Sequence, residues 1–181
     1  MGGSLLEEEI EEINLLLPFK ILAAVETGTY KGQSAKLLSK YYSVVHTIEL
    51  RPDLYEEAKK NNSDCKNIIH HRSDSVTILP EIINSLNCPT LYFLDAHLSG
   101  VDSAWDGRDN VPLLEELDVI LFFQTHPSVF IFDDLRLFDD KFQWNGVNME
   151  TIKHTFERYN WIIITDHCKN DRFYVIAKPS S

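Results

Sequence analysis

The chain has 181 residues, of which 44% are hydrophobic and 25% are charged. This balance is typical of a soluble globular protein, and no repeat, low-complexity tract or linker divides the sequence, so one domain over residues 1–181 is expected. The formal net charge is −11. An acidic surface repels phosphate groups, which disfavours nucleic acid as a partner and favours a small molecule.

Membrane insertion and secretion are not expected. No apolar run reaches the roughly 18 residues of a membrane span, and the acidic N-terminal segment lacks the basic region of a secretory signal. The three cysteines, Cys65, Cys88 and Cys168, show no paired spacing. Neither a disulfide framework nor a zinc site is therefore predicted, and the protein is expected to be cytoplasmic with reduced thiols.

The first predicted element is a helix over residues 4–17, SLLEEEIEEINLLL. Apolar residues recur at helical spacing, Ser4 and Glu7 fit a capping box, and Pro18 ends the pattern. This helix is expected either to cover a binding site or to mediate a homodimer.

Strands and helices then alternate along the chain. The expected strands are residues 21–26, 44–50, 67–72, 90–97, 128–135, 161–167 and 172–179, and the expected helices are residues 33–42, 52–60, 75–86, 111–123 and 149–159. The helix over residues 75–86 is expected to kink or to begin near Pro80. Alternation predicts an α/β fold with a mainly parallel sheet and helices on both faces, and the turn-like CKND before residue 172 predicts an antiparallel last strand.

Acidic residues or an Asp-containing turn end all five strands that are expected to be parallel. These residues are Glu26, Glu49, Ser73 with Asp74, Asp95, Asp133 and Asp134. In such sheets ligands bind beyond the carboxyl ends of the strands, where the winding direction reverses. An alternative is that each acid caps the helix that follows, which accounts for one or two strands but poorly for five.

The loop after the first strand reads Glu-Thr-Gly-Thr-Tyr-Lys-Gly-Gln-Ser over residues 26–34. Gly28 and Gly32 allow a sharp turn and a close approach of the backbone to a ligand. The amino terminus of the following helix favours an anion. The loop matches neither the GxGxxG of dinucleotide sites nor the GxxxxGK[ST] of phosphate-binding loops. A plain strand-to-helix turn is the alternative.

An acid at a strand end suits a ligand that carries a cation, and S-adenosylmethionine has an ammonium and a sulfonium beside a carboxylate. Glu26 is expected to bind the ammonium, Ser34 and the turn amides the carboxylate, and Glu49 both ribose hydroxyls, because a carboxylate is a paired acceptor. Asp74 is expected at the edge of the adenine and Leu50 against its face. The predicted cofactor-binding residues are Glu26, Thr27, Gly28, Thr29, Tyr30, Gly32, Ser34, Glu49, Leu50, Ser73, Asp74, Ser75 and Asp95.

Five blocks carry a family resemblance, in order over about residues 20–136: ETGTYKGQSA, HTIELRPDLYEEA, SDSVTILPEI, LYFLDAH and VFIFDDLR. Together they resemble class I S-adenosylmethionine-dependent methyltransferases, and the acid–x–Gly–x–Tyr–x–Gly–x–Ser loop is similar to that of metal-dependent O-methyltransferases of the catechol and macrocin type. The resemblance implies a Rossmann-like, doubly wound, seven-stranded sheet in the order 3-2-1-4-5-7-6. It also implies methyl transfer to a hydroxyl of a small molecule such as a sugar.

The same resemblance implies a divalent metal, with Mg²⁺ expected, held by Asp95, Asp133 and Asp134. These residues end neighbouring strands, about 4.8 Å apart, and a hard cation between them relieves their repulsion. The metal would lower the pKa of an acceptor hydroxyl and orient it for attack on the methyl group. The alternative is that Asp133 or Asp134 caps a loop while Asp95 pairs with Arg136 or Arg108.

His97, two residues after Asp95, is expected to act as a general base or as a fourth metal ligand, so His97 and Asp95 are the predicted catalytic residues. The chain departs from the catechol enzymes at Leu98, where they carry a lysine base. Two further functions stay open: a metal-independent N-methyltransferase, and a nucleotide-binding module without catalysis.

Overall fold

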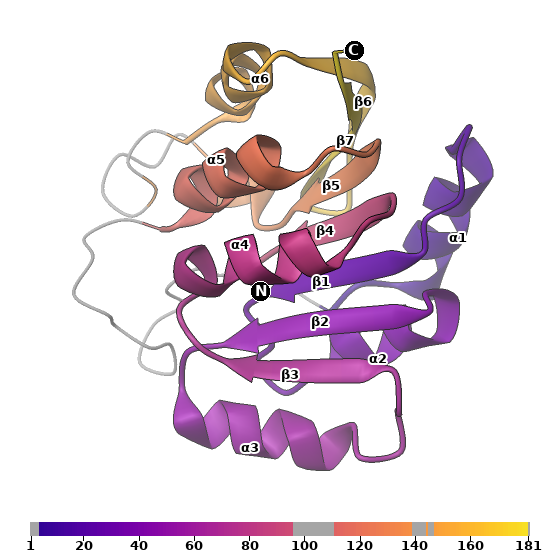
Figure 1. The fold of residues 1–181 in the computed structure, drawn as a ribbon, viewed down its shortest axis with the longest axis vertical. Helices are drawn as coiled ribbons and strands as arrows, with labels where there is room; N and C mark the ends of the chain where they lie inside the picture. Colours follow the sequence, from indigo (N-terminus) through magenta and orange to yellow (C-terminus); the bar gives the residue numbers. More distant parts are fainter. Residues whose placement is uncertain (1–3, 96–110, 139–143, 145–146, 181) are drawn as a thin grey trace.

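The computed structural model describes residues 4–95, 111–138, 144 and 147–180. They form a seven-stranded sheet in the order β3-β2-β1-β4-β5-β7-β6, in which β7 runs antiparallel to its neighbours β5 and β6 (Figure 1). The strands are β1 (Ala23–Thr27), β2 (Val44–Glu49), β3 (Ile68–Arg72), β4 (Thr90–Leu94), β5 (Ser128–Phe132), β6 (Trp161–Lys169) and β7 (Arg172–Pro179). The predicted α/β fold and its strand order are confirmed.

Helices cover both faces of this sheet (Figure 1). They are α1 (Glu7–Leu16), α2 (Gln33–Tyr41), α3 (Pro52–Asn61), α4 (Ser75–Ser85), α5 (Leu113–Phe123) and α6 (Met149–Arg158). Successive strand residues face opposite layers, so Ala24 and Phe93 pack with α1 and α2, whereas Val25 and Tyr92 pack with α4, α5 and α6. Strands buried on both faces explain the continuous apolar runs of the sequence.

The winding direction of the sheet reverses between β1 and β4. β1 pairs with β2 on one side and with β4 on the other, all in parallel. Beyond the ladder, the Asp95 amide donates to the Thr27 carbonyl at 3.1 Å and the Asp133 amide to the Leu94 carbonyl at 3.2 Å. The carboxyl ends of β1, β4 and β5 therefore form one continuous edge at the position where open α/β sheets bind ligands.

The N-terminal helix begins later than the sequence predicts. α1 starts at Glu7 after Leu6, and the Glu9 carboxylate accepts the Leu6 amide at 2.8 Å. The predicted capping box of Ser4 and Glu7 is therefore wrong, because the acid that satisfies the free amide lies two residues further along the chain. The helix ends before Pro18, as predicted.

Helix α4 is continuous through its proline. It begins at Ser75, and the Asp74 carboxylate caps it by accepting the Thr77 amide at 2.9 Å. Pro80 lies inside the helix, which continues to Ser85. Asp74 therefore has the helix-capping role that was the alternative explanation for acids at strand ends.

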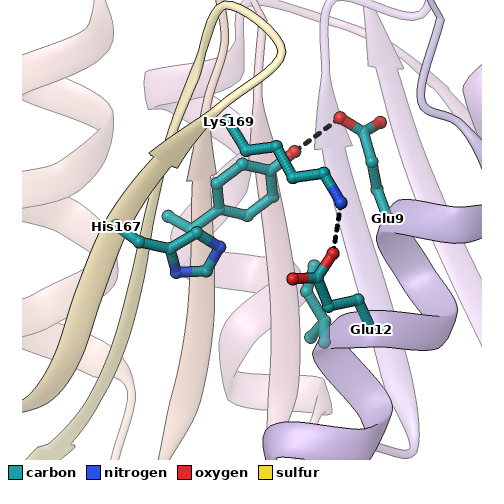
Figure 2. Close-up of a pocket in the computed structure, with 6 residues that line it drawn as sticks. Glu9, Glu12, His167 and Lys169 are labelled. Carbon is teal, nitrogen blue, oxygen red and sulfur yellow. Dashed lines mark hydrogen bonds and ion pairs between the residues drawn. The ribbon is translucent and has the colours of Figure 1, made fainter.

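Helix α1 is attached to the β6–β7 hairpin by buried charges. Both carboxylate oxygens of Glu9 accept from Nη1 of Arg172 at 2.9 Å, and the Tyr174 hydroxyl donates to Glu9 at 2.7 Å. Figure 2 shows Glu9 and Glu12 facing the hairpin, with Lys169 paired to Glu12. The space between these side chains is too small to hold a water molecule, so α1 packs directly against the hairpin. The predicted roles of α1 in covering the site or in forming a homodimer stay predictions.

The described helices are short, and α4 and α5 have 11 residues each. None of the helices in residues 4–95, 111–138 and 147–180 is long and apolar enough to cross a membrane. The cysteines Cys65, Cys88 and Cys168 are free thiols.

Candidate functional site

The loop between β1 and α2 is held against β2. The amides of Gly28 and Thr29 both donate to the Ile48 carbonyl, at 3.0 and 3.1 Å. Gly28 and Gly32 adopt left-handed conformations with φ of 82° and 81°. A Cβ atom on Gly32 would lie 2.5 Å from the side-chain nitrogen of Asn62, so a larger residue would have to displace this side chain in addition to adopting a left-handed backbone.

The Glu49 carboxylate is a preorganised acceptor at the end of β2. One oxygen accepts the Tyr30 amide at 2.8 Å, and the other accepts the Arg51 amide at 2.9 Å. Burial raises the pKa of Glu49, and these backbone hydrogen bonds oppose that rise. Each oxygen keeps a second lone pair, so the group can accept two hydroxyls of one ligand in a fixed geometry.

Glu26 is 1% exposed at the end of β1. The Thr47 hydroxyl donates to it at 2.5 Å, and the Thr47 and Thr29 hydroxyls are also 2.5 Å apart. Burial raises the pKa of Glu26 to about 8, and the charges of Asp95 and Glu49 add to the rise. A carboxyl group in this environment keeps its proton at neutral pH. A cationic ligand such as an ammonium group would favour the ionised form and take the place of the proton.

Four backbone amides of the β1–α2 loop donate hydrogen bonds within the protein. Besides Gly28 and Thr29, the Tyr30 amide is taken by Glu49 and the Gly32 amide by the Thr29 carbonyl at 2.9 Å. The Ser34 hydroxyl accepts the Leu5 amide at 3.1 Å. These four amides therefore have partners within the protein, and the expected binding of the cofactor carboxylate by Ser34 and the turn amides stays a prediction.

The predicted adenine-binding residues lie beside Glu49. Leu50 is 37% exposed at the rim, and the Ser73 amide donates to the Glu49 carbonyl at 3.1 Å. Ser75 is buried at the start of α4. The structure thus brings the ends of β1, β2 and β3 together around the loop, as the parallel arrangement predicts.

The sequence interpretation missed one buried acid in this region. Glu116, in the first turn of α5, is 1% exposed and accepts the hydroxyls of Thr27 and Ser75. Its partners lie 89 and 41 positions away along the chain. The only available signal was an acid in the middle of the apolar run VPLLEELDVILFF, which is equally typical of a solvated helix face.

Asp133, at the end of β5, is 2% exposed and faces a buried arginine. Nε of Arg172 lies 3.1 Å from its carboxylate. Burial and then the charge of Asp95 raise the pKa of Asp133 to about 7, and Arg172 opposes this rise. The Asp133 carboxyl group therefore lies between the cation of Arg172 and the acid Asp95 at the edge of the sheet.

Asp134 is fully buried and has a left-handed backbone with φ of 57°. It pairs with Arg136, which also pairs with Asp171. Two of the three predicted metal ligands thus already face arginines. Among the residues that the structure describes, no group of three or more His, Cys, Asp or Glu side chains is placed to hold a metal ion. The predicted Mg²⁺ site at Asp95, Asp133 and Asp134 does not fit this arrangement.

The second predicted catalytic residue, His97, lies outside the described residues together with Leu98 and Arg108. Its expected roles as a general base or a metal ligand stay predictions. Asp95 itself is half-buried at the end of β4, beside Thr27 of β1.

Comparison with solved structures identifies proteins of the same fold. The N-methyltransferase NodS from Bradyrhizobium japonicum WM9 matches with a TM-score of 0.63 and 10% identity, over 96% of this chain and 94% of that chain. NodS in complex with S-adenosyl-L-homocysteine matches with a TM-score of 0.62 and 13% identity, over 96% and 87% of the two chains. An S-adenosylmethionine-dependent methyltransferase from Clostridium acetobutylicum ATCC 824 matches with a TM-score of 0.64 and 8% identity, over 97% and 91%.

The chain has the fold of S-adenosylmethionine-dependent methyltransferases. Comparisons of the sequence with family models and with curated proteins found no match. At these identities the structural likeness concerns the fold, and the chemistry must be argued from the residues at the site.

Proposed function

We propose that the protein binds S-adenosylmethionine at the carboxyl ends of β1 and β2 and transfers its methyl group to a small molecule. One observation carries this proposal: the buried carboxyl groups of Glu26 and Glu49 lie at the ends of the neighbouring strands β1 and β2, next to a glycine loop and beside the position where the sheet reverses. The shared fold supports it, because one neighbour was solved with S-adenosyl-L-homocysteine.

Each carboxyl group suits a different part of this cofactor. The two oxygens of Glu49 are held by backbone amides, so they are oriented to accept the two ribose hydroxyls. Glu26 would release its proton to solvent as the ammonium binds, so a neutral buried carboxyl group would become one half of an ion pair. When bound, the cofactor supplies an electrophilic methyl group on its sulfonium.

The acceptor is proposed to bind at the carboxyl ends of β4 and β5. Asp95 and Asp133 lie on this edge, and the raised pKa of Asp133 allows it to take a proton from an acceptor near neutral pH. The net charge of −11 supports a small acceptor over a nucleic acid.

The group that accepts the methyl is proposed to be either a hydroxyl or an amine. A hydroxyl requires a base, and Asp133 is suitably placed for that task. Metal-independent transfer to an amine is a second candidate, favoured because Arg172 and Arg136 already face Asp133 and Asp134. No step of either reaction is assigned to a metal ion.

Calorimetric titration with S-adenosylmethionine tests the binding step. We expect binding by the wild-type protein and a loss of about 10-fold or more for Glu49→Ala, because two charge-assisted hydrogen bonds disappear. NADH is the control ligand. Binding of NADH in place of S-adenosylmethionine would contradict the proposal.

Methyl transfer from labelled cofactor to panels of small alcohols and amines tests the second step. Turnover should be the same with and without EDTA. Loss of turnover in EDTA and its recovery with Mg²⁺ would contradict the metal-independent chemistry.

A further inference from the structure

Glu116 connects three elements beneath the proposed cofactor site. It belongs to the first turn of α5, and one of its carboxylate oxygens accepts the Ser75 hydroxyl at 2.5 Å, at the start of α4. The other oxygen accepts the Thr27 hydroxyl at 3.1 Å, at the end of β1. Each oxygen therefore holds a different segment.

Glu116 lies among core residues of its own helix. Leu113, Leu117 and Ile120 of the same helix belong to the hydrophobic core, and Glu116 is 1% exposed among them. A buried acid lowers stability unless its hydrogen bonds offset the loss of hydration, and an apolar side chain of similar size is often as stable or more stable. Stability of the core alone therefore does not account for an acid at this position.

The two hydroxyl donors belong to segments that bear the predicted ligand contacts. Thr27 is the last residue of β1 and lies between Glu26 and Gly28 in the sequence. Ser75 follows Ser73, whose amide donates to the Glu49 carbonyl. A shift of either donor would move one side of the site relative to the other.

We infer that Glu116 is a positioning residue that sets the affinity for S-adenosylmethionine. It does so by fixing the end of β1 and the start of α4 relative to each other. This inference rests on the proposed function. Glu116 acts through Thr27 and Ser75, whose hydroxyls orient toward its carboxylate and fix their backbones.

Two substitutions separate hydrogen bonding from charge and from packing. In Glu116→Gln the amide can accept one hydroxyl and donate to the other, since a hydroxyl serves in both roles, so we expect an affinity within about threefold of wild type. Glu116→Met keeps the length but loses both hydrogen bonds, and we expect an affinity about 30-fold weaker, from two bonds of roughly 1 kcal/mol each.

The free energy of unfolding, measured with urea on the same samples, distinguishes positioning from a structural role. We expect Glu116→Met to be folded but less stable than wild type, because the buried Thr27 and Ser75 hydroxyls lose their acceptor. Cofactor affinity is therefore measured far below the unfolding transition, where a loss of stability alone leaves the affinity unchanged. Glu115→Met is the matched control, since Glu115 is exposed on the same turn, and its cofactor affinity should not change. If Glu116→Met does not fold, Ser75→Ala removes one hydrogen bond and should weaken binding about fivefold.

Wild-type affinity in a folded Glu116→Met or Ser75→Ala protein would overturn the inference while leaving the proposed function intact. An equal loss of cofactor affinity in Glu116→Gln and Glu116→Met would overturn the inference as well, because the hydrogen bonds that glutamine preserves would then not determine the affinity. Failure of the wild-type protein to bind the cofactor would overturn both the inference and the proposed function.

Discussion

Replacing Glu26 with glutamine should separate protein stability from cofactor affinity. Burial raises the pKa of Glu26 from 4.5 to about 8. Between pH 4.5 and 8 the folded protein therefore holds one proton more than the unfolded protein, and the free energy of unfolding falls as the pH rises. Glutamine resembles the protonated acid and does not titrate, and its carbonyl oxygen can still accept the Thr47 hydroxyl.

The size of the effect follows from the pKa difference. A pH of 7 is about 2.5 units above the pKa of Glu26 in the unfolded protein, and each unit corresponds to about 1.4 kcal/mol. At pH 7 the free energy of unfolding of Glu26→Gln should therefore exceed that of wild type by about 3 kcal/mol. Below about pH 4.5 the two proteins should be equally stable. The same substitution should weaken S-adenosylmethionine binding about 10- to 100-fold, because the ammonium loses a charged partner.

Urea denaturation from pH 4.5 to 8.5, with calorimetric titration of the cofactor, measures both effects. Glu56→Gln is the control, since Glu56 is exposed and its loss should change neither quantity. A Glu26→Gln protein with the pH dependence of wild type would refute the assignment of the buried proton to Glu26. Unchanged cofactor affinity in a stabilised variant would refute the ammonium-binding role alone.

Three further changes test the physical account of the fold. Arg172→Met should lower the free energy of unfolding by about 3–5 kcal/mol, because it leaves two buried carboxyl groups without their cation; a loss below about 1 kcal/mol in urea denaturation would contradict this. Burial and His71 lower the pKa of His46 to about 4, so its neutral form contributes stability above pH 6.5 that is lost as the pH falls toward 4. His46→Gln should therefore reduce the loss of stability in acid, and an unchanged acid transition would count against the assignment. Gly32→Ala should lower the free energy of unfolding by at least about 1–2 kcal/mol through its left-handed backbone, and a loss below about 0.5 kcal/mol in urea denaturation would contradict this.

Local patterns in the sequence predicted the architecture. Apolar runs and helical periodicity placed every described strand and α-helix, and the alternation indicated the sheet. The strand expected over residues 128–135 ends at Phe132, and a short 3-10 helix over Leu135–Leu137 was not predicted. Because parallel strands end at one edge, the acids at positions 26, 49 and 95 could be expected to converge there, and the structure brings them together. These features depend on neighbouring residues and on the geometry of a strand–helix unit, which a short window of sequence contains.

The charge balance of the site was decided by tertiary structure. Asp133 and Asp134 have the residue type and spacing of metal ligands, but Arg172 and Arg136 face them in the folded chain. Glu116 resembled a solvated helix acid, yet it is buried against hydroxyls far away in the sequence. Burial and the identity of a distant ionic partner determine what a carboxyl group does, and both exist only after the chain has folded.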